Sequence, residues 1–183
     1  MQKTNNDVPI FLQGTKAQKE NKPLIEDTCD FFLKDKTLRE GMARMLEFSH
    51  EIRMKPSWMA ANWYQCRYKG KCVVTYNIAK ENFLRVTIHL AEKDDLKRIM
   101  LAQKDDVIAE FFDRKTTHCS SCSPSTCVYG GASMEINGEN HYYCSRFNYI
   151  CNNPTQRQFK IMELFIELRR NYIDAKKAEN KSW

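Results

Sequence analysis

The sequence predicts an α+β fold: an antiparallel β-sheet built from hairpins, packed against helices and carrying a Cys-rich loop. Two dipeptides, Lys69-Gly70 and Asn137-Gly138, each separate stretches rich in aromatic and β-branched residues, which is typical of tight hairpin turns. Residues 83–90 alternate between apolar and polar side chains, as half-buried strands do. Helical patterns precede, interrupt and follow these strands, and this order favours an antiparallel sheet covered by helices.

The predicted strands follow from these signals. The first hairpin joins Trp63–Tyr68 to Lys71–Ile78, and the alternating segment Phe83–Leu90 forms the next strand. In the second hairpin, the strand after Asn137-Gly138 is expected to run from about His141 to Ile150.

The first clear helix is expected to begin at Thr37, because Thr37 and Glu40 have the spacing of a capping box. It is expected to end at Lys55-Pro56, because the residue before a proline is pushed out of the helical region. Residues 92–113 read as a second helix, with a break near 105–106.

The last helix is expected to open with Asn153 as N-cap and Pro154 at the first helical position. Its apolar residues between Phe159 and Ile173 cover more than half of its circumference. So broad a face predicts burial against the sheet and a further contact with a second copy of the chain.

A chain of 183 residues is long enough for one domain with a buried core. Residues 1–24 are polar and interrupted by proline and glycine, and we interpret them as an N-terminal arm. Residues 25–175 are expected to form a single α+β domain, followed by a basic C-terminal tail at 176–183.

The sequence has no apolar run near the roughly 20 residues that span a bilayer, which predicts no membrane helix. Its first residues lack the apolar region of a secretory signal, so we expect a cytoplasmic protein with reduced thiols. The net charge is +6, but much of the excess lies in residues 1–24 and 155–183. Because nucleic-acid binders concentrate charge on one face, a nucleic-acid partner is not favoured.

Four cysteines between residues 119 and 144 carry the main functional prediction. Cys119 and Cys122 form a CxxC pair, Cys127 follows in the same Ser/Pro-rich loop, and Cys144 lies in the predicted second hairpin. Thiolates from a loop and a neighbouring hairpin are a common way to assemble a tetrahedral zinc site. The four cysteines are therefore predicted to bind a structural zinc ion.

The other candidate ligands follow from position. His118 and His141 are the substitutes if one cysteine is not a ligand. In an unbroken strand, Cys144 and Cys151 point to opposite faces, so Cys151 is assigned to the core. Three alternatives to zinc remain: unligated thiols, a redox-active CxxC, and an iron–sulfur cluster.

The remaining cysteines, Cys29, Cys66 and Cys72, are expected to be small buried apolar residues. A two-residue turn at Lys69-Gly70 does not place Cys66 opposite Cys72, so no disulfide is expected between them.

Aromatic residues gather near the start of the predicted sheet. They are Trp58, Trp63, Tyr64 and Tyr68. Core packing is the simpler interpretation. The alternative is a small-molecule pocket, since such pockets are mostly apolar with a few polar groups.

Sequence motifs of the P-loop, dinucleotide-binding, zinc-protease and serine-hydrolase types do not occur. No catalytic residues are therefore assigned. The prediction is a binding or regulatory module for a small molecule, with a structural zinc site. A thiol-based redox enzyme or sensor that uses Cys119 and Cys122 is the alternative.

One resemblance adds to this interpretation. The order of four features, over roughly residues 36–173, resembles the small bacterial YdhG-like domains. The features are Lys55-Pro56-Ser57-Trp58, the strand pair around Lys69-Gly70-Lys71, the strand Phe83–Ile88 and the acidic start of a helix at Glu92-Lys93-Asp94. The resemblance implies a compact α+β fold in a bacterial-type protein. Some of those domains are discussed as iron-handling proteins, and the cysteine cluster departs from them.

Overall fold

The computed structural model describes residues 8–91, 93–113, 132–143 and 149–179. Its elements are η2 (Ile10–Leu12), α1 (Thr15–Asn21), α2 (Ile25–Phe32), α3 (Lys36–Glu51), β1 (Pro56–Ala60), β2 (Trp63–Tyr68), β3 (Lys71–Lys80), β4 (Phe83–Ile88), α4 (Lys93–Leu101), α5 (Asp105–Phe112), β5 (Ala132–Ile136), β6 (Glu139–Tyr143), β7 (Tyr149–Asn152) and α7 (Gln156–Glu179). An antiparallel sheet has the strand order β1-β2-β3-β4-β7, and β5 and β6 form a second, two-stranded sheet. The predicted α+β class is confirmed.

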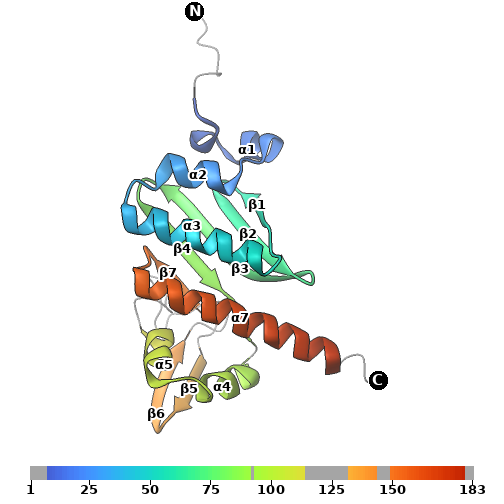
Figure 1. The fold of residues 1–183 in the computed structure, drawn as a ribbon, viewed down its shortest axis with the longest axis vertical. Coiled ribbons are helices and arrows are strands. Elements are labelled where there is room, and N and C mark those ends of the chain that lie inside the picture. Colours follow the sequence, from blue (N-terminus) through green and yellow to red (C-terminus); the bar gives the residue numbers. More distant parts are fainter. Residues whose placement is uncertain (1–7, 92, 114–131, 144–148, 180–183) are drawn as a thin grey trace, which may run out of the picture.

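Helices α2, α3 and α7 lie on one face of the five-stranded sheet (Figure 1). Helices α2 and α3 cross the part formed by the first strands, and α7 lies beside α3 and contacts β3 and β4. Helices α4 and α5 and the β5–β6 hairpin gather on the other side of α7. The chain therefore builds its main core between the sheet and the layer of α2, α3 and α7.

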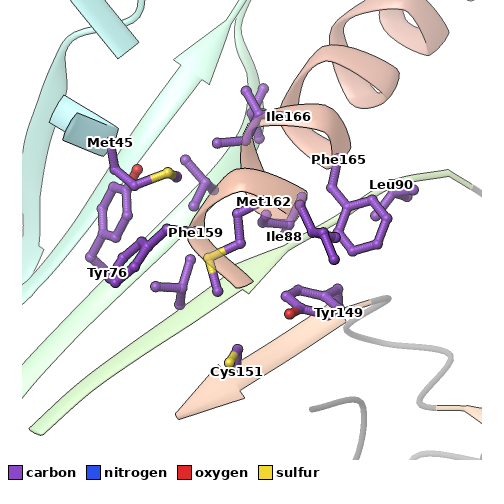
Figure 2. Close-up of a cluster of buried hydrophobic side chains, with 14 of the residues drawn as sticks. Met45, Tyr76, Ile88, Leu90, Tyr149, Cys151, Phe159, Met162, Phe165 and Ile166 are labelled. Atoms are coloured by element: carbon purple, nitrogen blue, oxygen red, sulfur yellow. The ribbon is translucent and has the colours of Figure 1, made fainter. Parts of the chain in front are cut away.

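The core is formed by side chains that share one face of the sheet. The register aligns Tyr64, Tyr76, Val86 and Cys151 across β2, β3, β4 and β7, and each is at most 1% exposed. Met162 and other apolar side chains of α7 reach toward this row (Figure 2). Apolar burial of this kind contributes most of the favourable free energy of folding. The core position predicted for Cys151 is confirmed.

Both predicted hairpin turns are present. Lys69 and Gly70 have φ values of 47° and 82°, and Asn137 and Gly138 have 51° and 82°. Two consecutive positive φ values define the type I′ turn, whose twist matches that of the flanking strands. The predicted break in the helix of residues 92–113 is also present, because α4 ends at Leu101 and α5 begins at Asp105.

The predicted strand from His141 to Ile150 is wrong. Strand β6 ends at Tyr143, and β7, which begins at Tyr149, pairs with β4 in the other sheet. The hairpin signal gives local pairing, but the sheet that β7 joins is decided by contacts with a strand far away in the chain. Strand β1, which pairs with β2 at the sheet edge, was not predicted.

The N-cap predicted for the first long helix is also wrong. The helix begins at Lys36, and the Asp35 side chain accepts a hydrogen bond from the Leu38 N–H at 3.0 Å. Aspartate and threonine both make good N-caps, so the capping-box spacing alone did not distinguish Asp35 from Thr37.

At the last helix, the capping residue is Thr155 rather than Asn153. The Thr155 N–H donates to Gln158 Oε1 at 2.9 Å, and the Gln158 N–H donates to Thr155 Oγ1 at 3.3 Å. These reciprocal bonds form a capping box. Asn153 instead ties β7 to β4, because its Oδ1 accepts from the Leu84 N–H at 2.9 Å.

Residues 8–24, which fall within the predicted N-terminal arm, dock on the sheet through Gln18, which is fully buried. Its Oε1 accepts from the Asn62 N–H at 2.9 Å and from Trp58 Nε1 at 3.4 Å. Its Nε2 donates to the carbonyls of Phe11, at 3.3 Å, and Gln13, at 3.0 Å. A single side chain thus joins η2 and α1 to the edge formed by β1 and β2.

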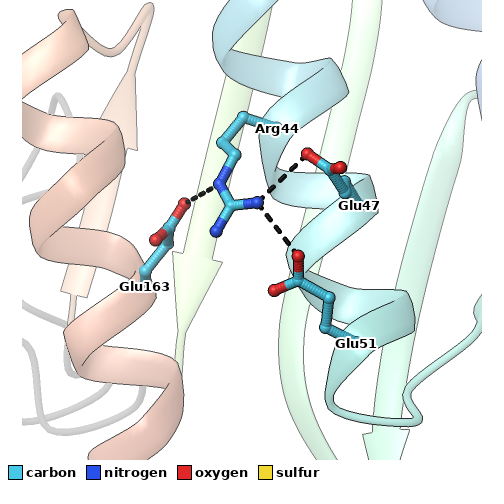
Figure 3. Close-up of polar contacts among 4 residues, drawn as sticks. All are labelled: Arg44, Glu47, Glu51 and Glu163. Carbon is cyan, nitrogen blue, oxygen red and sulfur yellow. Dashed lines mark hydrogen bonds and ion pairs between the residues drawn. The ribbon is translucent and has the colours of Figure 1, made fainter.

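Helices α3 and α7 meet through a close backbone approach and an ion-pair cluster. Gly41 of α3 faces the ring of Phe159 on α7, which leaves no room for a Cβ atom. At the surface, the Arg44 guanidinium lies 3.1 Å from Glu163 of α7, 3.0 Å from Glu47 and 3.2 Å from Glu51 (Figure 3). The two helices are therefore joined by the Gly41–Phe159 contact in the core and by the Arg44–Glu163 ion pair at the surface.

Candidate functional site

A cavity of about 470 Å³ opens where the N-terminal end of α2 meets the end of α3 and the start of β1. Its volume lies within the range of small-molecule sites. The apolar part of its lining includes Pro23, Ile25, Pro56, Trp58 and Tyr64. The cavity is therefore a concave, largely apolar surface beside the sheet edge.

Two Lys-Pro dipeptides frame the cavity, and their local chemistry explains why the chain turns there. Lys22 caps the C-terminal end of α1 with a φ of 42°, and Pro23 follows it. Lys55 lies between α3 and β1, and Pro56 is the first residue of β1. Because proline disfavours helix in the residue before it, each dipeptide separates one element from the next. Pro56 begins an edge strand, a position where proline is tolerated in a sheet.

Tyr64 forms the floor of the cavity and is only 1% exposed. Its hydroxyl lies 2.5 Å from Thr28 Oγ1 and donates to the Leu24 carbonyl at 3.3 Å. Burial raises the pKa of the Tyr64 phenol to about 12, so the phenol is neutral at physiological pH. These contacts tie the floor to α2.

Trp58 forms a wall of the same cavity and is half-buried. Its indole Nε1 donates to Gln18, which also holds α1 against the sheet edge. The orientation of the Trp58 ring is therefore coupled to the docking of the N-terminal helices.

Ionisable side chains also line the cavity, and three of them are basic. Lys22, His50 and Lys55 come from the end of α1, the last turn of α3 and the α3–β1 connection. Glu26, in the first turn of α2, is the acidic lining residue. Among the residues that the structure describes, Lys22, Glu26, His50 and Lys55 form no ion pair, either with one another or with other side chains.

The four aromatic residues of the predicted pocket do not converge. Trp58 and Tyr64 share the cavity, whereas Trp63 is paired with Asn77 and lies on the opposite side of the sheet. Tyr68 packs against α7, where its hydroxyl donates to Asp174 Oδ2 at 3.1 Å. Strand alternation separates Trp63 from Tyr64, because successive side chains point to opposite faces.

The predicted zinc ligands Cys119, Cys122, Cys127 and Cys144 lie outside the described residues, as does His118. The substitute ligand His141 lies in β6. Its ring stacks on Phe112 with the ring centroids 4.4 Å apart, and its Nε2 is 3.8 Å from Glu139 Oε2. Within residues 8–91, 93–113, 132–143 and 149–179, no three metal-binding side chains of the His, Cys, Asp or Glu types come together.

The four described cysteines are free. Burial raises the thiol pKa of Cys29, Cys66 and Cys151 to about 12, and raises that of half-buried Cys72. A thiol with a raised pKa is a poor nucleophile at neutral pH. In the β2–β3 register, Cys66 pairs with Val74 and Cys72 pairs with Arg67, so the two thiols are not directly opposed, as expected.

Sequence reasoning missed most of the lining, including Lys22, Pro23, Glu26 and Lys55. The detectable signal was the repeated Lys-Pro dipeptide, once after α1 and once before β1. It marks two chain turns, but nothing local indicates that the two turns lie side by side.

In the part of the chain that the structure describes, no helix has the length and apolarity to cross a membrane. Comparisons with family models, curated proteins and solved structures found no match to this chain.

Proposed function

We propose that this chain is a small-molecule-binding or regulatory module whose binding site is the cavity between α2, α3 and β1. The observation that supports this proposal is the lining itself: a concave apolar surface that includes Trp58 and Tyr64, together with basic and acidic residues. Small-molecule sites typically combine such walls with a few polar groups that orient the ligand. No catalytic step is assigned to the site.

The test is a fragment screen read by the indole N–H resonance of Trp58 in a two-dimensional NMR spectrum. Binding in the cavity is expected to shift this resonance. The variant Leu24→Trp places a large ring at the cavity margin and is expected to abolish the shifts. Leu101→Trp is the matched control, because Leu24 and Leu101 are similarly exposed, at 61% and 51%, and only Leu24 lines the cavity. Fragments that bind both variants and the wild type equally would contradict the proposal.

A structural zinc ion held by Cys119, Cys122, Cys127 and Cys144 remains the second part of the proposal. Its support is the CxxC pair and the two further cysteines that follow it in the sequence. Protein purified without added metal is expected to contain about one zinc per chain, and Cys122→Ser is expected to lose it. Cys72→Ser is the control, since Cys72 lies in β3. Metal-free wild-type protein would exclude the site.

The redox alternative would have to use Cys119 and Cys122, because burial makes the described thiols poor nucleophiles. Rapid alkylation of those two cysteines in the metal-free protein would favour it. The resemblance to YdhG-like domains and the contact with a second copy of the chain stay predictions.

A further inference from the structure

We infer that the cavity selects small anions with a planar apolar body, such as aromatic carboxylates or aryl phosphates. This inference rests on the proposed function, since it names the ligand class of the same site. Its basis is that basic residues from three separate segments line one largely apolar cavity, together with a single carboxylate residue.

The charge balance of the lining favours an anion. Lys22 and Lys55 carry two positive charges against the one negative charge of Glu26, and His50 adds another basic group. Glu26 has a local reason for its position, because a carboxylate in the first turn of a helix is favourable. Lys55 has no such reason, since it lies between α3 and β1. An anion bound in the cavity would be attracted by both lysines.

The shape and chemistry of the walls favour a flat apolar body. Trp58 supplies an aromatic wall over the buried Tyr64, and two proline rings complete the apolar lining. Aromatic rings gain from stacked or edge-on contacts with other rings. The ligand would therefore place its ring against Trp58 and its anionic group toward Lys22 and Lys55.

The lining also argues against two other ligand classes. A cationic aromatic would meet a net positive margin, and Glu26 alone would have to outweigh two lysines. A wholly apolar ligand would contact the walls but gain nothing from Lys22 and Lys55, which are exposed at the cavity.

The experiment compares four probes of the same ring size: 2-naphthoate, 2-naphthyl phosphate, neutral 2-naphthamide and cationic 2-naphthylmethylamine. Affinity is measured by titration while the Trp58 indole N–H resonance is followed. Both anions are expected to bind at least about ten-fold more tightly than the amide, and the amine more weakly than the amide. The ratio of carboxylate to phosphate affinity then identifies the preferred anionic group.

The double variant Lys22→Met/Lys55→Met is expected to reduce the affinity for both anions to that for the amide. It should leave the amide affinity unchanged, which also shows that the variant is folded. The control is Lys97→Met/Lys160→Met, in which two exposed lysines outside the cavity lining are replaced and anion binding is expected to persist.

Two results would overturn the inference. Equal binding of the amide and the anions at Trp58 would reject anion selection while leaving the cavity a binding site. Binding of none of the four probes would reject both this inference and the proposed function.

Discussion

Replacing Gly41 by alanine sets two physical effects of opposite sign against each other. Gly41 lies inside α3, where alanine is favoured over glycine by about 1 kcal/mol through helix propensity alone. The new Cβ, however, would lie 2.0 Å from Cε2, 2.1 Å from Cδ2 and 2.6 Å from Cζ of Phe159. Ordinary carbon contacts are about 3.5–4.0 Å, so the ring or the helix must shift by roughly 1.5 Å.

The surroundings of Phe159 decide which effect is larger. The ring is only 2% exposed and lies near Met45, Tyr76 and Met162 in the core (Figure 2). A ring in a well-packed core has little free space to enter, and overpacking typically costs about 1–3 kcal/mol or more. We therefore expect Gly41→Ala to lower the free energy of unfolding by about 2 kcal/mol, which corresponds to a fall in Tm of roughly 4–8 °C.

The assay is chemical and thermal denaturation of a double-mutant cycle. Phe159→Leu removes the ring atoms that the Cβ would meet, so Gly41→Ala should be much less costly in that background, with a coupling energy above about 1 kcal/mol. Ala43→Gly, at an exposed position of the same helix, measures the propensity effect alone. If Gly41→Ala stabilises the protein as much as Ala43→Gly destabilises it, the close packing of α3 on α7 is refuted.

Three further changes test other features of the fold. Gln18→Leu leaves the buried Asn62 N–H without its acceptor and should lower the free energy of unfolding by about 2–3 kcal/mol. Gln103→Leu is the control: it loses one local bond, to the Ile99 carbonyl at the end of α4, and should have little effect on denaturation curves. Arg44→Ala should lower Tm by less than Gly41→Ala does, because exposed ion pairs contribute little. Salt screens such pairs, so a fall in Tm that is unchanged in 1 M NaCl would argue against a role for the Arg44 ion pairs. Burial raises the pKa of Cys66 from 9.0 to about 12, so its neutral form contributes fully to stability below pH 9. Between pH 9 and 12, the free energy of unfolding should fall by up to about 1.4 kcal/mol per pH unit through this thiol. In urea titrations, Cys66→Ala should make the fall of stability with pH less steep by that amount.

Much of the fold could be predicted because its signals are local. A two-residue turn such as Lys69-Gly70 needs positive φ values that glycine provides, and the alternation of residues 83–90 reports a strand with one buried face. Where two neighbouring residues could serve equally well as an N-cap, the sequence pattern did not predict which one does. Asp35 and Thr37 are both competent N-caps, and only the path of the chain into α3 selects Asp35.

The candidate site was less predictable. Two of its aromatic residues, Trp58 and Tyr64, were singled out from the sequence. Trp63 faces the other way because successive strand positions point to opposite faces. Tyr68 lies at the far end of β2, where it contacts α7. The cysteine cluster, the most conspicuous sequence signal, lies outside the described residues.

The sequence by itself determined the α+β class, the two hairpin turns, the break between α4 and α5 and the burial of Cys151. Only the tertiary structure decided that β7 joins β4, that Gln18 holds α1 to the sheet, and that Lys22 and Lys55 line the same cavity. The reason is physical: turn and periodicity preferences act over a few residues, whereas these contacts depend on how distant segments pack together to bury the core.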